Sequence, residues 1–186
     1  MTKRHTLIRS LHDVGVAAWF GGSLMGAVGL NGAAAAAHDP AERTRLSSLG
    51  WKRWSPVAAA AIGAHAVGGA GLIVTDRGRI AQHEGTRANT GVKLVLTVAA
   101  AGLTAWSGAL GRTVEEHSDQ GAQGATEPSA AASKKLASAQ KQLQVVQWAI
   151  PALTGVLVVM GAQQGEQQRP SQQLAGRLSA KALRSS

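Results

Sequence analysis

The chain has 186 residues and a formal net charge of +9, with 19 Lys and Arg against 10 Asp and Glu, and this length predicts one compact unit. Because it has no cysteine, it forms neither a disulfide scaffold nor a thiolate metal site. Its 45% hydrophobic residues lie in long blocks, which excludes a disordered chain, and its 16% charged residues fall below the quarter typical of soluble domains.

The first apolar block, residues 14–37, has no Asp, Glu, Lys, Arg or His, and Ser23 and Asn31 are its only strongly polar side chains. A helix needs about 20 apolar residues to cross a bilayer core of about 30 Å. We therefore expect a first membrane span over about 12–33. Two alternatives stay open: a cleaved signal peptide with a cleavage site in residues 33–37, and a soluble alanine-rich bundle, which a mean hydropathy of -0.01 favours.

The first loop predicts a short helix, because Asp39 can cap its N-terminus, Pro40 suits its first position and Gly50 can close it. Trp and basic residues then precede the second span. Tryptophan rings favour the headgroup level and cations meet anionic lipid phosphates, whereas a nucleic-acid patch is the rival explanation. We expect interfacial anchors at Trp51, Lys52, Arg53, Trp54, Trp106 and Trp148.

Three further apolar blocks predict spans over about 55–75, 92–111 and 145–163. The loop before the last span begins with an acidic, Gly-rich and therefore flexible stretch. A helix over about 129–144 then continues into the last span, with a stripe of Leu136, Ala139, Leu143, Val146 and Ile150. The expected membrane domain covers 1–164, and a polar, flexible tail follows over 165–186.

Small residues recur at helical spacing in the first two spans. Glycine and alanine let helix backbones approach closely in lipid, so we expect these faces to pack together. They comprise Ala18, Gly22, Gly26 and Gly29 in the first span and Ala64, Gly68 and Gly71 in the second.

His65 lies in the middle of the second apolar block, and an intramembrane ionisable group is a candidate for function. Ser23, Thr104 and Thr154 are its expected hydrogen-bond partners. His65 and His12 are the candidates for a cofactor site, yet the apolar blocks place them about 10 Å apart in depth, at ~1.5 Å per residue, which argues against one haem iron between them. A divalent metal could draw on His12, Asp13, Asp76, His83 and Glu84, although their spacing is no recognised ligand pattern.

No nucleophile with a base, no P-loop and no dinucleotide motif is readable, so we expect neither an enzyme nor a cofactor. His12 followed by Trp19-Phe20-Gly21-Gly22 resembles the opening helix of copper-resistance D-type small multi-pass membrane families. The segments 50–56 and 147–151 resemble those of uncharacterised actinobacterial four-span membrane proteins. The first resemblance implies a metal- or redox-linked membrane function through His12.

The sequence thus predicts an all-α four-helix transmembrane bundle with Gly/Ala-rich packing and short interfacial helices. Eleven Lys and Arg residues lie on the side of the termini and eight in the other two loops, which favours a plasma-membrane protein with both termini in the cytoplasm. The expected partners are a bilayer with anionic headgroups and a second copy or a larger membrane complex, and not nucleic acid. The leading function is a non-catalytic scaffold or accessory subunit; the alternative is a small transporter or redox- or metal-linked protein using His65 or His12.

Overall fold

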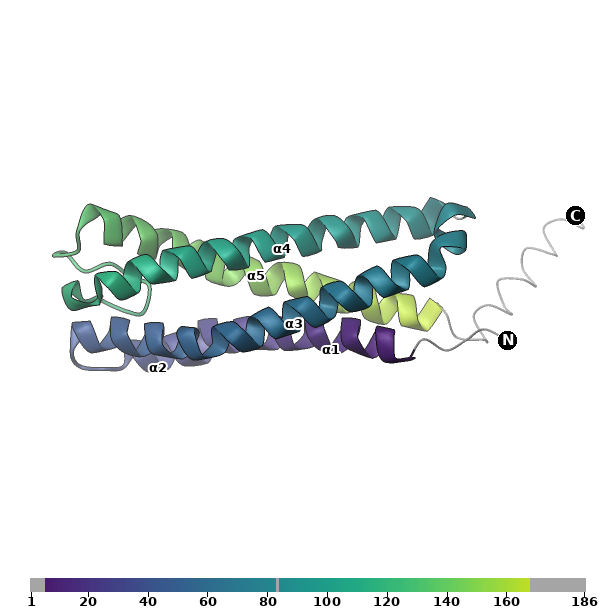
Figure 1. The fold of residues 1–186 in the computed structure, drawn as a ribbon. Helices are drawn as coiled ribbons and strands as arrows, with labels where there is room; N and C mark the ends of the chain where they lie inside the picture. Colours follow the sequence, from purple (N-terminus) through teal and green to yellow (C-terminus); the bar gives the residue numbers. More distant parts are fainter. Residues whose placement is uncertain (1–5, 83, 168–186) are drawn as a thin grey trace, which may run out of the picture.

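The computed structural model describes residues 6–82 and 84–167 and shows an all-α four-helix bundle (Figure 1). The part of the tail beyond residue 167 lies outside the described residues. The elements in chain order are α1 (Thr6–Met25), the π-helical turn η1 (Gly26–Leu30), α2 (Asn31–Ala35), α3 (Pro40–Gln82), α4 (Glu84–Glu116), the 3₁₀ turn η2 (Ser118–Gln120) and α5 (Lys134–Gln167).

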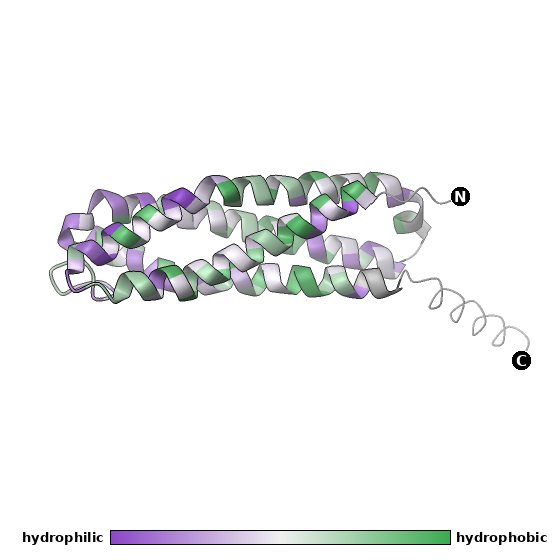
Figure 2. Ribbon diagram, turned by 90° about the horizontal axis from the view of Figure 1, so that it is seen from below, coloured by the Kyte–Doolittle hydropathy of each residue, from purple (hydrophilic) through white to green (hydrophobic). Residues whose placement is uncertain are grey.

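The four long rods run antiparallel to their chain neighbours. The first rod, α1 through α2, packs on α3 and α5, and α4 closes the ring against α3 and α5. All four are long and apolar enough to cross a membrane, with 30, 39, 33 and 30 residues in the candidate spans. At ~1.5 Å per residue, even 30 residues measure about 45 Å, so each rod extends beyond a hydrocarbon core of about 30 Å. Hydrophilic residues gather toward the two ends of the bundle, as Figure 2 shows. The chain is therefore a multi-pass membrane protein.

A π turn changes the packing face of the first rod. The expected face assumed a regular α-helix, but η1 accommodates an extra residue in its turn and rotates everything after it. Gly29 is consequently exposed, and a Cβ placed on it would lie nearest to the side chain of Met25 in the same rod. Asn31 instead turns into the bundle, where it is 7% exposed. The assignment of Gly29 to the packing face was wrong for this reason.

The loop helix and the second span form one continuous helix. Asp39 caps it as expected, since its carboxylate accepts from the backbone N–H of Ala41 at 2.8 Å. Gly50 does not end it, however, and α3 continues through Gly50 and Pro56 to Gln82. A side chain at Gly50 would collide with Leu30 of the first rod, so this glycine serves close packing inside a helix.

The loop between α4 and α5 is packed, although its composition predicted flexibility. Ala122 and Ala125 are 1% and 5% exposed. Arg43 of α3 donates to the carbonyl oxygen atoms of Ala37 and Gln123, both at 2.7 Å, and Thr44 donates to that of Ser118 at 2.8 Å. Side chains of α3 thus satisfy the backbone of this loop and hold it over the end of the bundle.

The expected stripe on the last helix is confirmed as a core face. Leu136 and Ala139 are buried against Leu110 and Val114 of α4. Further along, Val146 and Ile150 join a central cluster that also contains Trp19, Ala61 and Ala100. This helix begins at Lys134, five residues later than expected, and the Ser133 hydroxyl oxygen caps it by accepting from the backbone N–H of Leu136. The Trp19 ring of α1 is 1% exposed and lies in the centre of the core.

Candidate functional site: a histidine pair between two helices

The structure brings His12 of α1 and His65 of α3 into direct contact. Their ring centroids lie 4.3 Å apart, with the ring planes tilted by 36°. Glycine makes this approach possible on both helices: a Cβ on Gly15 would lie 2.6 Å from the backbone nitrogen of His65, and one on Gly68 would collide with that of His12. Two glycines therefore set the helix separation at which the two imidazoles meet.

The expected difference in depth between these histidines was wrong. It placed His12 about one turn inside the first span and His65 near the middle of the second, but α3 begins 14 residues before Trp54 and α1 packs along its later part. The helix offset therefore follows the packing of α1 on α3 and not the midpoints of the apolar runs. Only tertiary structure fixes that offset.

Both ring nitrogens of His65 bond to neighbouring helices. Its Nδ1 lies 3.0 Å from the carbonyl oxygen of His12, and its Nε2 lies 3.2 Å from Oγ1 of Thr97 on α4. A carbonyl oxygen only accepts, so Nδ1 carries the proton in this bond and Nε2 of the neutral ring accepts from the threonine hydroxyl. His65 is 3% exposed. It therefore ties α1, α3 and α4 together at one level.

The hydroxyl partners expected for His65 were wrong. Thr104 accepts from Nε1 of Trp19 at 3.1 Å, which links α1 to α4 across the bundle. Ser23 and Thr154 donate to carbonyl oxygens of their own helices. Thr97, about two helical turns closer to the start of α4, takes the place expected of Thr104.

His12 is the more open ring of the pair. Its Nδ1 lies 2.8 Å from Oδ1 of Asp13, with side chains that are 12% and 51% exposed. Its Nε2 forms no hydrogen bond with any other described residue. The charges that act on the His65 ring are those of Asp13 and Lys93, together with His12 when it is protonated. This site therefore has one imidazole committed to helix contacts and one beside a half-exposed carboxylate.

The remaining candidate metal ligands do not join this site. Among the described residues, no three His, Asp or Glu side chains form a set that could hold a metal ion. Glu84 lies 3.9 Å from the guanidinium of Arg87 in its own helix, and Asp76 belongs to no such set. His83 lies outside the described residues.

The distance between the His12 and His65 rings decides whether the pair could ligate a haem iron from both sides. Axial ligation holds an imidazole nitrogen about 2 Å from the metal on each of its two sides. Rings in contact at 4.3 Å leave no such gap, and both nitrogens of His65 are already bonded. The pair is thus unsuited to bis-histidine ligation, because the rings are too close and not because they lie at different depths.

A second buried polar cluster, which the sequence did not predict, surrounds Asn31. Its amide nitrogen donates to Oε1 of Gln147 on α5 at 2.8 Å. Its carbonyl oxygen accepts from the Ser47 hydroxyl at 3.0 Å and from Nε1 of Trp51 at 2.9 Å. The available signal was that Asn31 is one of two strongly polar residues in the first apolar block.

The tryptophans divide into two groups. The rings of Trp51 and Trp54 lie over Gly26 and Gly22, where a Cβ would collide with them, so both pack α3 against the first rod. Lys52, between them, pairs with Glu115 of α4 at 2.8 Å. Trp106 and Trp148 are 50% and 51% exposed, on the surface where an interfacial anchor would lie.

The other small residues of the expected packing faces lie beside side chains of the neighbouring helices or are half-buried. A Cβ on Gly71 would lie 2.7 Å from the Ile8 side chain of α1. Ala18 packs against the central cluster, and Ala64 is half-buried.

The chain matches no protein-family model, no curated protein and no solved structure. The two polar clusters and the surface are therefore the features from which a function can be inferred.

Proposed function

We propose that the protein is an integral membrane scaffold or accessory subunit without catalytic activity of its own. The observation that carries this proposal is the bonding of His65, whose two ring nitrogens both contact neighbouring helices. The Asn31 cluster and the Trp19–Thr104 bond act in the same way. These three sets of bonds thus hold the helices in a rigid bundle, which is what a protein needs to present a defined surface to partners.

The outer face of α4 supports a role in assembly. Val95, Val98 and Leu94 are 68%, 64% and 55% exposed, and little of this helix is buried within the bundle. In the proposal this face meets lipid and either a second copy or a larger membrane complex. The experiment is gentle detergent extraction followed by mass measurement: a stable assembly of defined mass above the 19.0 kDa chain is expected, and a purely monomeric protein would contradict it.

The runner-up is a small transporter or a redox- or metal-linked protein that uses His12 or His65. The specific observation in its favour is His12, whose Nε2 bonds to no described residue and whose Nδ1 faces Asp13. The resemblance to copper-resistance D-type proteins also concerns this residue. Visible absorption and metal analysis of the extracted protein separate the two functions: the scaffold predicts no Soret band and no stoichiometric metal, whereas either signal, lost in His12→Gln, would favour the runner-up.

The proposal includes a plasma-membrane location with both termini in the cytoplasm, supported by the excess of basic residues on that side. A reporter that is active only in the cytoplasm should be active when fused after Ser186. Inserted after Ala131, an exposed residue in the turn before α5, it should be silent. The reverse pattern would invert the orientation, and activity at both positions would contradict the four-span topology.

A further inference from the structure

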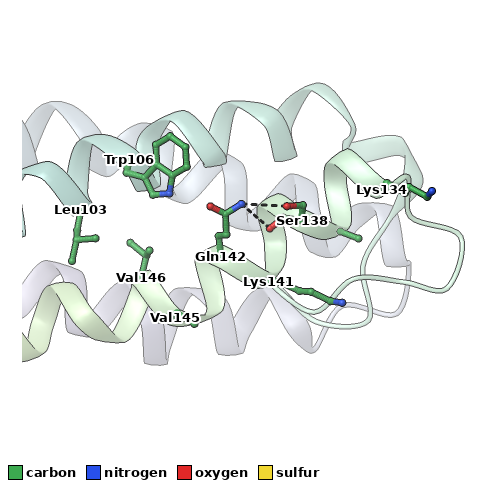
Figure 3. Close-up of a pocket in the computed structure, with 9 residues that line it drawn as sticks. Leu103, Trp106, Lys134, Ser138, Lys141, Gln142, Val145 and Val146 are labelled. Carbon is green, nitrogen blue, oxygen red and sulfur yellow. Dashed lines mark hydrogen bonds between the residues drawn. The ribbon is translucent and has the colours of Figure 1, made fainter.

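We propose that the groove between α4 and α5 binds a glycerophospholipid with an anionic headgroup. The groove has a volume of about 740 Å³ (Figure 3). Its α5 side presents Lys134, Ser138, Lys141 and Val145, which recur three and four residues apart and so share one face of the helix. Its α4 side presents Trp106.

The groove is polar toward the outer end of the bundle and apolar further in, as a phospholipid is polar at its headgroup and apolar along its chains. Lys134 lies at the end of the bundle that carries the α4–α5 loop, and Ser138 and Lys141 lie about one and two helical turns further along α5. Gln142, which donates to the Ser138 hydroxyl at 3.2 Å, comes next. Leu103 and Val146 line the inner part. Cations, hydroxyl and amide groups thus share the outer part, where they can meet a phosphate and the glycerol esters, and apolar side chains line the inner part for the acyl chains.

The surroundings of the groove indicate lipid as its occupant. The groove opens sideways on a bundle whose helices are long and apolar enough to cross a membrane, so the molecules that reach it are those of the bilayer. Val145 at its rim is 69% exposed and Trp106 is 50% exposed. An acyl chain can therefore enter from the bilayer without any opening of the bundle.

The charges at its outer end select the headgroup. Among the described residues, neither Lys134 nor Lys141 forms an ion pair, whereas their neighbour Lys135 lies 3.7 Å from a carboxylate oxygen of Glu116. Two ammonium groups that pair with no acidic side chain in the described part of the chain complement a phosphate in a headgroup of net negative charge. A zwitterionic headgroup would place its own cation beside them. The geometry therefore favours phosphatidylglycerol over phosphatidylcholine.

The test compares two double variants with the same loss of charge. Lys134→Gln/Lys141→Gln removes the groove lysines, and Lys52→Gln/Lys135→Gln removes two ion-paired lysines outside the groove. Each protein is placed in nanodiscs of equal phosphatidylglycerol and phosphatidylcholine, and native mass spectrometry records the lipids that stay bound. Wild type and the control should retain phosphatidylglycerol over phosphatidylcholine by at least about fivefold, and the groove variant should retain both equally. No preference in wild type, or a preference that survives in the groove variant, would overturn the proposal.

Fluorescence places the bound lipid in the groove. Brominated acyl chains quench nearby tryptophans, so brominated phosphatidylglycerol should quench wild type more than brominated phosphatidylcholine does. Trp106→Phe should remove most of that difference, while Trp148→Phe, at an exposed position outside the groove, should leave it unchanged. Equal quenching by both lipids in wild type, or a difference that is insensitive to Trp106→Phe, would show that the lipid binds elsewhere or without selectivity.

Discussion

The interface between the first rod and α3 has two halves that pack in opposite ways. Near the start of α1, Gly15 and Gly68 bring the two backbones together, and a Cβ at either position would meet backbone atoms. Near the other end, glycines receive the large rings of Trp51 and Trp54. Small residues therefore act as close-contact sites in one half and as sockets for tryptophan in the other.

The polar clusters in the two halves follow from this difference. Where the backbones are close, the ring of His65 can use the carbonyl oxygen of His12 as an acceptor. Where tryptophan rings separate the helices, side chains must bridge the gap, and Asn31 reaches both α3 and α5. Helix separation thus decides which kind of polar group can link two membrane helices.

The largest loss of stability is expected when a methyl group is added where the backbones of α1 and α3 are closest. In Gly68→Ala the new methyl group would collide with backbone at His12 and lie 2.7 Å from the carbonyl oxygen of Ile8. Backbone cannot rotate away as a side chain can, so we expect a loss of about 3 kcal/mol in the free energy of unfolding, the upper end of overpacking costs. Thermal melts in detergent measure it. Gly63→Ala is the matched control, because its Cβ would meet nothing within 4 Å; equal melts for both variants would contradict the close approach.

The tryptophan half should be most sensitive at Asn31. Asn31→Leu keeps the side-chain size but leaves Ser47, Trp51 and Gln147 without their buried partner. We expect a loss of about 2 kcal/mol, since stranded buried polar groups cost ~1 to 3 kcal/mol. In the same melts Ser107→Ala should behave like the parent, because that hydroxyl bonds only to its own helix. A parent-like melt for Asn31→Leu would mean that this cluster does not link the helices.

A smaller effect is expected from the bond that joins α3 to α4. His65→Asn shortens the side chain so that it no longer spans from His12 to Thr97. Hydrogen bonds between membrane helices contribute ~0.6 kcal/mol on average, so the loss should be about 1 kcal/mol for two bonds. A double-mutant cycle with Thr97→Val should give a coupling energy of about 0.6 kcal/mol. Strictly additive losses would exclude a direct interaction between these two side chains.

The smallest effect on the stability of the whole protein is expected from a change in the contacts of the α4–α5 loop. Arg43→Lys keeps the charge but loses the geometry that serves the carbonyl oxygens of Ala37 and Gln123. We expect amide hydrogen exchange in residues 117–128 to become about tenfold faster while the melting temperature barely changes, because local opening is independent of the core. Arg45→Lys, at an exposed pair with Glu42, is the control and should leave that exchange unchanged. Unaltered exchange in Arg43→Lys would show that the loop is held by other contacts.

Much of the fold could be predicted from the apolar blocks. Four uninterrupted runs long enough for a bilayer specify four helices, because only intrahelical bonds satisfy the backbone in lipid. The stripe from Leu136 to Ile150 likewise specified which face of the last helix is buried. The cap at Asp39 is equally local, since it depends on residues that adjoin the helix start.

The candidate site could not be predicted in the same way. His65 and His12 were both visible as unusual residues, but their contact depends on the offset of two helices, to which residues along the entire interface contribute. The inward position of Asn31 could not be predicted, because η1 rotates the helix after Gly26 and nothing in the spacing of the small residues indicates that turn. The sequence shows which polar residues are present in each apolar block. It does not show which residue of another helix each of them contacts.

The sequence by itself determined the class of structure, the number of spans and the residues available for chemistry, because these depend on the hydrophobicity and length of single segments. Tertiary structure alone decided that two histidines touch, that an asparagine joins three helices and that lysines border an apolar groove. These features arise between helices, where offset and rotation follow from the sum of many contacts. The glycines of this bundle illustrate both contributions. The sequence shows where a side chain is missing, but only the tertiary structure shows whether a backbone atom or a tryptophan ring packs into the space.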